Sequence, residues 1–189
     1  MKRIVILASG SGTLAQAIFD ADFSDINGEV VALICDKPGA QVLERAEARH
    51  IESYLIPMQA DRNEWNSELE ALIAALRPDL VVSAGFMRIL PEAITSRCKI
   101  INSHPALLPL FPGAHAVRDA LAAGASETGT SIHWVDAGID TGEVIAQEKI
   151  EISEGDTEES LHERIKIIER GLIVATIRRV LPTLNLEPK

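Results

Sequence analysis

The sequence predicts an α/β fold in which a mostly parallel central sheet carries helices on both faces. Short, continuous apolar runs alternate with segments of helical periodicity along the first two thirds of the chain. Such runs are typical of parallel strands that are buried on both faces. The last two strand-like segments instead alternate apolar and polar residues, as antiparallel strands do. We therefore expect a parallel sheet with an antiparallel extension near the C-terminus.

Each expected element rests on a local pattern. Apolar or alternating runs place strands at residues 4–8, 30–35, 53–57, 80–84, 99–102, 128–135 and 144–152. Helical spacing places helices after residue 13 and at 41–50, 63–76 and 116–123, and Pro91 opens a short helix where proline is tolerated. Asp156 and Glu159 mark the start of a long final helix, which Pro182 ends. Its expected buried stripe is Leu161, Ile165, Ile168 and Leu172.

Composition narrows the classes of protein to consider. The net charge of −10 and the aromatic content of 4% argue against binding to nucleic acid or to an anionic membrane. No stretch approaches the roughly 20 apolar residues of a membrane-spanning helix. Cys35 and Cys98 lie far apart and in no metal-ligand spacing, so we expect buried thiols rather than a disulfide or a metal site.

The chain shows no internal repeat, linker or low-complexity segment. A length of 189 residues then fits a single domain, 1–189, of which residues 183–189 are expected to be a loose tail. The N-terminus has two basic residues and a short apolar run, but a glycine-rich turn follows at once. This pattern suits a first β-strand better than a signal peptide, so we expect a cytoplasmic protein.

Three stretches that contain polar residues or glycine follow expected parallel strands, namely 9–13, 85–90 and 102–115. Because ligands of such sheets bind at the carboxyl ends of the strands, these stretches should meet at one edge. The first, SGSGT, joins a strand to a helix and can present backbone N–H groups to an anion. It matches neither the dinucleotide fingerprint nor the nucleoside-triphosphate loop, and a tight turn with nothing bound is an equal alternative.

The stretch 101–115, INSHPALLPLFPGAH, carries the strongest chemical signal. Asn102 can stabilise a developing oxyanion, and His104 can carry a proton. Three prolines stiffen the segment that follows, because each fixes φ and removes a backbone donor. His115 closes the stretch, and support of the loop or approach to a ligand are equal alternatives for it. An isolated Asn-x-His is more often a capped turn than a catalytic pair. Whether this one is catalytic therefore depends on the other segments of the chain.

Four segments together resemble the phosphoribosylglycinamide formyltransferases, the folate-dependent enzymes of purine synthesis. The resemblance covers about residues 3–181. It rests on the loop 9–14, AGFMRIL at 84–90, NSHPALLPLFPGAH at 102–115 and GTSIHWVDAGIDTGEVIAQ at 129–147. The order and spacing of these segments make the resemblance specific. It implies a Rossmann-like formyltransferase fold.

The resemblance also implies roles for individual positions. The catalytic trio would be Asn102, His104 and Asp140. The ribonucleotide would be bound by the backbone of Ser11, Gly12, Thr13 and Leu14 and by Lys166 and Glu169, which share a face of the last helix. The folate pocket would comprise Arg62, Met87, Arg88, Ile89, Leu90, Asn102, Asp136, Ala137, Gly138, Ile139 and Asp140. Two positions depart from the family, because many members carry asparagine at Leu14 and an apolar residue at Ser103.

The implied reaction moves a formyl group from 10-formyltetrahydrofolate to the amine of N1-(5-phospho-D-ribosyl)glycinamide through a tetrahedral intermediate. Asn102 and a protonated His104 would stabilise the oxyanion, and Asp140 would orient His104 and raise its pKa. On sequence alone, Asp140 could equally be a turn residue before Thr141 and Gly142. The expected partners are these two small molecules, without metal, nucleic acid or membrane, and the formation of a homodimer is left open.

Three other functions compete with this interpretation. A formyltransferase that acts on an aminoacyl-tRNA or an amino sugar usually carries further domains, and tRNA favours a basic surface. A formyltetrahydrofolate hydrolase typically has an added N-terminal regulatory domain, whereas the first strand here is expected near Arg3. A dehydrogenase-like binding module would place an acidic residue after the second strand, as Asp36 does, but would also need a conventional dinucleotide loop.

Overall fold

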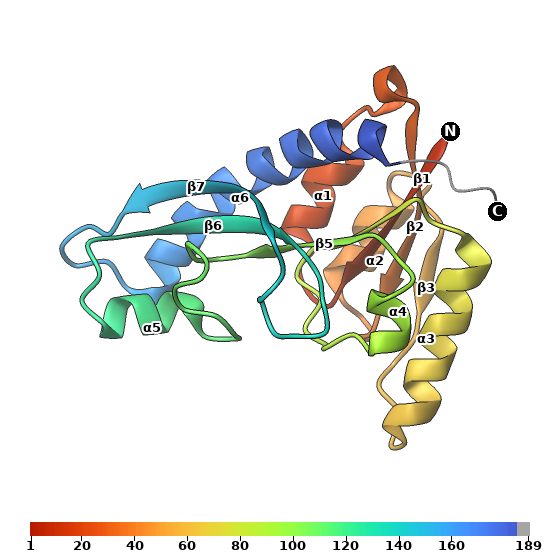
Figure 1. Ribbon diagram of the computed structural model, residues 1–189, viewed down its shortest axis with the longest axis horizontal. Coiled ribbons are helices and arrows are strands. Elements are labelled where there is room, and N and C mark those ends of the chain that lie inside the picture. Colours follow the sequence, from red (N-terminus) through yellow and green to blue (C-terminus); the bar gives the residue numbers. More distant parts are fainter. Residues whose placement is uncertain (185–189) are drawn as a thin grey trace.

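The computed structural model describes residues 1–184, and its elements surround one seven-stranded sheet (Figure 1). The strands are β1 (Lys2–Ala8), β2 (Gly28–Cys35), β3 (Ser53–Leu55), β4 (Leu80–Ser83), β5 (Ile100–His104), β6 (Glu127–Trp134) and β7 (Val144–Glu151). Their order is β3-β2-β1-β4-β5-β6-β7, in which β1 to β5 are parallel and β6 and β7 pair antiparallel with their neighbours. The predicted parallel sheet with an antiparallel extension is confirmed.

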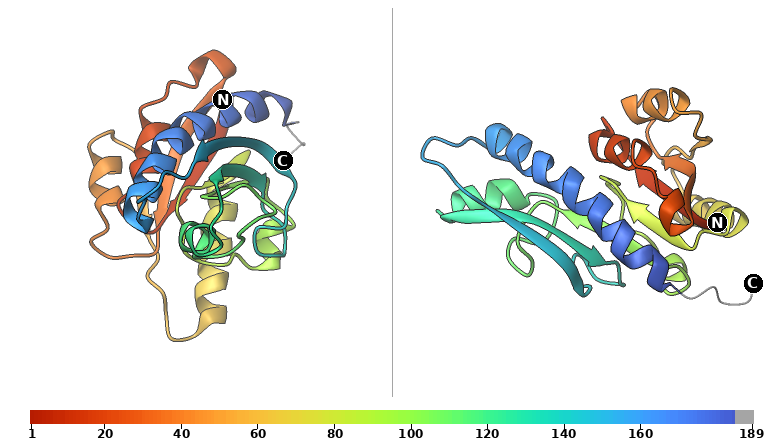
Figure 2. Two further views of the ribbon diagram at one scale, coloured as in Figure 1. Left: turned by 90° about the vertical axis from the view of Figure 1, so that its left-hand side faces the viewer. Right: turned by 90° about the horizontal axis from the view of Figure 1, so that it is seen from above.

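The helices cover both faces of the parallel part (Figure 2). They are α1 (Thr13–Phe19), α2 (Gln41–Glu47), α3 (Arg62–Leu76), α4 (Glu92–Thr95), α5 (Ala116–Ala122) and α6 (Glu158–Val180), with the short 3-10 helices η1 (Ser24–Ile26) and η2 (Leu181–Thr183). Alternate residues of β1 point to opposite faces, as in any strand. Ile4 and Ile6 pack with α1, α2 and α6, whereas Val5 and Leu7 pack with α3 and α4. The apolar run of β1 therefore serves two cores at once.

Strands β6 and β7 extend beyond the parallel strands and give the molecule its elongated shape (Figure 1). A third, smaller apolar cluster lies under this extension, where Val117 of α5 meets Leu161 and Ile165 of α6. Ile150 of β7 packs against the same cluster. The first half of α6 thus supports the extension, while its second half covers the parallel part of the sheet.

The start of α6 differs from the prediction. Thr157 is the N-cap, and its side chain accepts from the backbone N–H of Ser160, whose hydroxyl accepts in return from the N–H of Thr157. Asp156 lies one residue outside this capping box and accepts from the Ser160 hydroxyl at 2.9 Å. A hydroxyl pair therefore replaces the acidic pair that the sequence suggested, because serine at the third helical position can return the capping bond as glutamate does.

The buried stripe of α6 was also predicted only in part. Leu161 and Ile165 are buried, but Ile168 and Leu172 are half-buried. The stripe continues instead through Glu169 and Ile173, Thr176, Ile177 and Val180. Steps of four residues lead from Leu161 to Glu169 on one helix face, so a carboxylate lies in the middle of the buried face.

The first two residues of the expected tail, Thr183 and Leu184, make ordered contacts. Thr183 ends η2, where its hydroxyl donates to the carbonyl of Val180 at 2.7 Å, and Leu184 packs against the first core. The Nζ of Lys2 also donates to the carbonyl of Leu184 at 2.7 Å. These contacts make residues 183 and 184 part of the fold, and the remainder of the expected tail lies outside the described residues. No helix within residues 1–184 has the length and apolar character needed to cross a membrane.

Candidate active site

His104 ends β5 and lies at the carboxyl end of the parallel strands, where it is only 3% exposed. Its Nε2 is 2.8 Å from the carbonyl oxygen of Phe111, in the loop that follows β5. Its Nδ1 is 3.3 Å from Oδ2 of Asp140. Both ring nitrogens therefore face oxygen atoms that can accept a hydrogen bond from a ring N–H. The fold holds this ring from two sides.

Asp140 comes from the loop between β6 and β7 and adopts a left-handed backbone conformation, with φ of +54°. Its Oδ2 accepts from the backbone N–H of Gly113 at 2.8 Å, and its Oδ1 is 3.4 Å from Nε2 of His133. Burial acts to raise the pKa of Asp140. The hydrogen bonds from His133 and Gly113, together with the nearby His104, outweigh burial and hold that pKa below its usual value. Asp140 is therefore an ionised partner for the histidines.

Asn102 lies on β5 directly opposite His133 of β6 in the antiparallel register. The amide Nδ2 of Asn102 is 3.2 Å from Nε2 of His133, and Nδ1 of His133 is 2.8 Å from the carbonyl oxygen of Trp134. The ring of His133 thus lies between the amide of Asn102 and the carboxylate of Asp140. The structure brings the predicted trio together and adds His133 as a fourth member.

The sequence alone did not identify His133, which was expected to be an ordinary strand residue without a chemical role. It lies in a strand whose residues are buried on both faces, so its local pattern resembles that of its neighbours. The only signal that could have found it is the register of β5 with β6, which places it beside Asn102.

The loop after β1 has the tight geometry expected of an anion-binding turn. Gly12 has φ of +71°, and a Cβ there would lie 2.4 Å from Cγ2 of Val42, so no larger residue fits. The Nε of Arg45 donates to the carbonyl of Ser11 at 2.7 Å and holds the loop from the side of α2. Leu14 is 7% exposed and packs into the first core, so only its backbone is available to a ligand.

Two loops at this edge are joined through Ser9. Its backbone N–H donates to the carbonyl of Gly85 at 3.1 Å, and its hydroxyl accepts from the N–H of Met87 at 2.9 Å. The loop after β1 and the loop after β4 therefore form one connected rim. The prediction that stretches far apart in the sequence meet at the carboxyl ends of the strands agrees with these contacts.

The two loops predicted to line the folate pocket, 87–90 and 136–140, expose apolar side chains. Met87, Ile89 and Ile139 are 73%, 63% and 55% exposed, respectively. Large exposed apolar residues gathered on loops around polar groups are typical of a ligand site. The remaining loop residues Asp136, Ala137 and Gly138 are exposed as well, and Oδ1 of Asp136 accepts from the Gly138 N–H and the Thr141 hydroxyl.

Two arginines predicted to contact the folate, Arg62 and Arg88, are fixed by different contacts. Arg62 donates to the carbonyl of Ile89 at 2.6 Å, and its guanidinium lies 4.4 Å from the ring centroid of Trp65. Arg88 pairs through Nε with Oδ2 of Asp36 at 2.5 Å. Asp36 was considered above only as a mark of a dinucleotide site, whereas here its buried carboxylate holds Arg88. Leu90 packs against the second core.

Lys166 and Glu169 lie on the same helix but in different environments. The Nζ of Lys166 is 2.7 Å from Oε1 of Glu163, near the surface. Glu169 is 8% exposed and accepts from the Ser103 hydroxyl at 2.6 Å. Burial raises the pKa of Glu169 above its usual value, although the Ser103 hydrogen bond and the charges of Lys166 and Arg170 act in the opposite direction.

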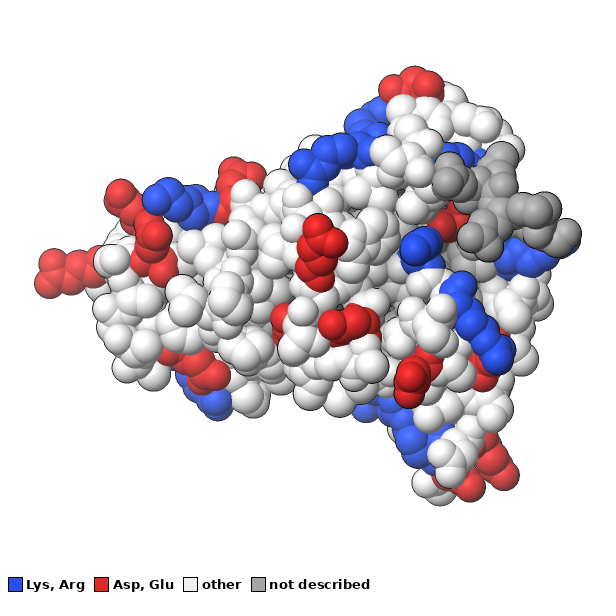
Figure 3. All heavy atoms as spheres, viewed as in Figure 1, with Lys and Arg blue, Asp and Glu red and all other residues white. Residues whose placement is uncertain are grey.

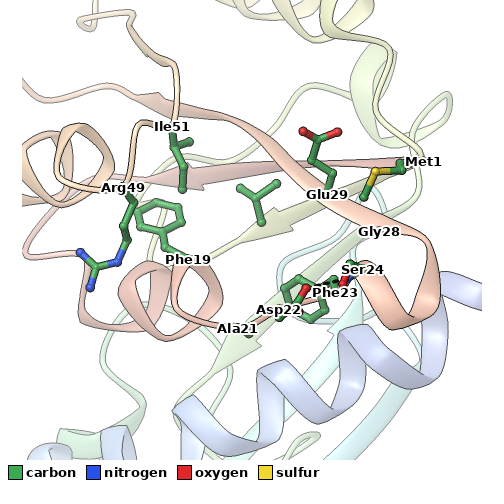
Figure 4. A pocket seen from close by; sticks show the side chains of 11 residues that line it. Met1, Phe19, Ala21, Asp22, Phe23, Ser24, Gly28, Glu29, Arg49 and Ile51 are labelled. Carbon is green, nitrogen blue, oxygen red and sulfur yellow. Dashed lines mark hydrogen bonds between the residues drawn. The ribbon is translucent and has the colours of Figure 1, made fainter.

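His115 is exposed and forms the N-cap of α5, where its carbonyl accepts from the N–H of Asp119. A cavity of ≈ 260 Å³ lies at the opposite end of the strands, between Phe19, Phe23, Arg49 and Ile51 (Figure 4). None of the predicted site residues lines it. The chemistry gathers at an open edge rather than in that cavity.

Acidic and basic side chains are interspersed over the face seen in Figure 3. Among residues 1–184, no group of three or more His, Cys, Asp or Glu side chains is arranged to hold a metal ion.

Cys35 is buried and Cys98 half-buried, and both are free thiols.

Comparison with known proteins defines the class of protein first. Residues 2–177 match the family described as formyl transferase. A phosphoribosylglycinamide formyltransferase of Mycobacterium tuberculosis is 45% identical over 93% of this chain and 83% of its own length. That of Bacillus subtilis is 40% identical over 96% of this chain and 95% of its own length.

Solved structures agree with these relatives. The crystal structure of phosphoribosylglycinamide formyltransferase from Bacillus halodurans superposes with a TM-score of 0.90 at 39% identity and covers 97% of both chains. Glycinamide ribonucleotide transformylase 1 from Symbiobacterium toebii gives a TM-score of 0.90 at 37% identity over 94% of this chain and 86% of its own. The chain belongs to the formyl transferase family, among its phosphoribosylglycinamide formyltransferases. The predicted family, enzyme class and fold are confirmed.

Proposed function

We propose that this chain transfers a formyl group from 10-formyltetrahydrofolate to the amine of N1-(5-phospho-D-ribosyl)glycinamide in purine biosynthesis. The observation that carries the proposal is the convergence of Asn102, His104 and Asp140 at the carboxyl end of β5. Their side chains supply an amide donor, a proton carrier and an ionised carboxylate: His104 lies 3.3 Å from Asp140, and the ring of His133 lies between Asp140 and Asn102. This set suits acyl transfer to an amine without a covalent enzyme intermediate.

In the proposed reaction, the amine nitrogen attacks the formyl carbon, and the carbonyl oxygen becomes an oxyanion. Asn102 and protonated His104 donate hydrogen bonds to that oxyanion. The intermediate collapses when the C–N bond to the folate breaks, the leaving nitrogen takes up a proton, and the former amine loses one. Because His104 Nε2 already contacts the carbonyl of Phe111, the substrate oxygen or a relay water must replace this contact during the reaction.

Asp140 would act through the histidines rather than on the substrate. Its lowered pKa keeps it ionised, so it can accept a hydrogen bond from a ring N–H of a neighbouring histidine. The Gly113 N–H holds the carboxylate, so its orientation does not depend on bound substrate. The Nε2 atom of His133 lies between the Asn102 amide and Oδ1 of Asp140, so the ring would set the spacing of these two side chains. We therefore propose positioning roles for Asp140 and His133.

We propose that the ribonucleotide phosphate binds the backbone of Ser11, Gly12, Thr13 and Leu14, with Lys166 and Glu169 beside the ribonucleotide. The folate would lie along Met87 to Leu90 and Asp136 to Asp140, with its charged end toward Arg62 and Arg88. The exposed apolar side chains of the two loops support this placement of the folate ring.

The deciding experiment follows loss of the formyl group from 10-formyltetrahydrofolate with and without the ribonucleotide, together with formation of the formylated ribonucleotide. Loss that requires the ribonucleotide supports the proposal. Loss without it would indicate a hydrolase, and no loss in either case would indicate a binding module. A His104→Ala variant run in parallel separates enzymatic transfer from spontaneous loss.

Other expectations from the sequence stay predictions. They are a single domain over 1–189, a cytoplasmic location, the absence of a metal or nucleic-acid partner and the open question of a homodimer. Light scattering of the purified protein addresses the last of these directly.

A further inference from the structure

Ser103 lies between Asn102 and His104 on β5 and is buried. Side chains alternate along a strand, so Ser103 points to the sheet face opposite its two neighbours. Its hydroxyl donates to Oε1 of Glu169 on α6 at 2.6 Å, and both residues are 8% exposed. A buried hydrogen bond to a carboxylate is among the stronger ones in proteins.

A second hydroxyl lies beside this contact. The Oγ of Ser103 is 3.4 Å from Oγ1 of Thr130 on β6, and Thr130 donates to the carbonyl oxygen of His104 at 3.2 Å. The one hydroxyl proton of Ser103 goes to Glu169 and that of Thr130 goes to the His104 carbonyl, so Ser103 and Thr130 are neighbours without a hydrogen bond between them. The side chain of Glu169 is held against the strand that carries Asn102 and His104.

We propose that Ser103 is a positioning residue that fixes the carboxylate of Glu169 for the ribonucleotide and thereby sets ribonucleotide affinity. This inference rests on the proposed function. Ser103 occupies Oε1 only, and a carboxylate accepts at both oxygens, so Oε2 keeps the capacity to accept from a ribose hydroxyl. Fixing the carboxylate before the ligand arrives lowers the ordering cost of binding.

The hydroxyl of Ser103 explains the direction of the expected effect on ribonucleotide affinity. An apolar residue at 103 would leave Oε1 of the 8% exposed Glu169 without this donor. Oε1 would then need a hydrogen bond from the ligand. Otherwise the carboxylate would turn toward Lys166, which lies one helical turn earlier. Ser103 removes this alternative because it supplies the donor from the rigid sheet.

The test measures KM for the ribonucleotide, KM for the formyl donor and kcat in Ser103→Ala and Ser103→Thr. We expect Ser103→Ala to raise KM for the ribonucleotide about tenfold, the scale of one lost hydrogen bond to a charged group. Its kcat and its KM for the formyl donor should stay within about twofold of the parent. Ser103→Thr keeps a hydroxyl and should restore KM for the ribonucleotide.

Two controls separate positioning from a general loss of structure. Thr176→Val deletes another buried hydroxyl of α6, which donates to the carbonyl of Leu172 at 2.7 Å, and should leave all three constants unchanged. In a Glu169→Gln background, Ser103→Ala should add less than about twofold, because the interaction it removes has already been weakened.

Several results would overturn the proposal. They are an unchanged KM for the ribonucleotide in Ser103→Ala, an equal fall of kcat in Ser103→Ala and Thr176→Val, or full additivity with Glu169→Gln. Calorimetric Kd values for the ribonucleotide alone keep this test distinct from the reaction. A parent that binds the ribonucleotide without transfer contradicts only the proposed reaction, and an unchanged Kd in Ser103→Ala contradicts only the positioning role.

Discussion

The apolar strands β1 and β4 and the junction of β5 with β6 are both buried but have opposite chemistry. In β1, residues Ile4 to Ala8 are all apolar and fully buried, and the buried residues of β4 up to Val82 are equally apolar. In β5 and β6, the buried residues include Ser103, His104, Thr128, Thr130, Ser131 and His133. Apart from Thr128, whose buried hydroxyl has no hydrogen-bond partner among the described residues, these polar groups contact one another, the backbone and two carboxylates.

The difference shows how one sheet separates stability from chemistry. Apolar strands between two layers of helices supply most of the favourable burial. The junction of β5 with β6 instead carries groups that are costly to bury and are kept in place by hydrogen bonds. Predictions for each part therefore differ in kind as well as in size.

The largest effect is expected from His104→Ala in the polar part. Turnover should fall roughly 100-fold or more, because a group that transfers a proton or stabilises the oxyanion is lost. Steady-state kinetics on protein with a verified cooperative unfolding transition measures this. A variant that retains turnover within a few fold of the parent would remove His104 from the mechanism.

A loss of stability without a comparable loss of chemistry is expected from Ile6→Ala in the apolar part. The cavity should lower the free energy of unfolding by about 2–5 kcal/mol, while Ile6→Val should cost about 0.5–1.5 kcal/mol. Denaturant titration gives these values, and kcat per folded molecule should stay within about twofold. A 100-fold fall in kcat would show that the two parts are not separable.

A gain in stability is expected from Glu169→Gln, measured without ligands. The pKa of Glu169 is raised by burial, so ionising it costs stability, and that cost grows as the pH rises above its unfolded value of 4.5. The variant should therefore be more stable than the parent at alkaline pH. The advantage should disappear below pH 4.5, where both states of the parent are protonated. An equal advantage at both pH values would argue against a buried ionisable group.

The smallest effect is expected from Lys149→Ala on the outer face of the antiparallel part. Lys149 pairs with Glu127 at 3.1 Å, and their side chains are 70% and 49% exposed. Exposed pairs contribute little, so the free energy of unfolding should change by less than about 1 kcal/mol, with unchanged kinetics. A larger change would show that the extension depends on its surface charges.

Much of the fold could be predicted because local patterns and burial agree along β1, β2 and β4. Where the local pattern and the observed burial disagree, the sequence predicted the structure less well. The apolar residues Ile168 and Leu172 appeared to define the buried face of α6, yet Glu169 occupies that face. A helix face is decided by what packs against it, and here the Ser103 hydroxyl makes burial of a carboxylate tolerable.

The site was predictable to a different degree at each residue. Asn102 and His104 lie together at the end of a strand, so their proximity follows from the sequence. Asp140 reaches them only because the β6–β7 loop folds back over β5, and its turn-like sequence does not reveal this. His133 gave no local signal because its role depends on the register between two strands.

By itself, the sequence determined the alternation of strands and helices, the antiparallel extension and the family to which the chain belongs. These features depend on short-range periodicity and on the order of motifs, both of which can be recognised directly in the sequence. Only the tertiary structure decided that His133 joins the trio, that Arg88 pairs with Asp36 and that Ser103 holds Glu169. Each of these contacts joins residues far apart in the chain, so its existence depends on register and packing rather than on any local pattern.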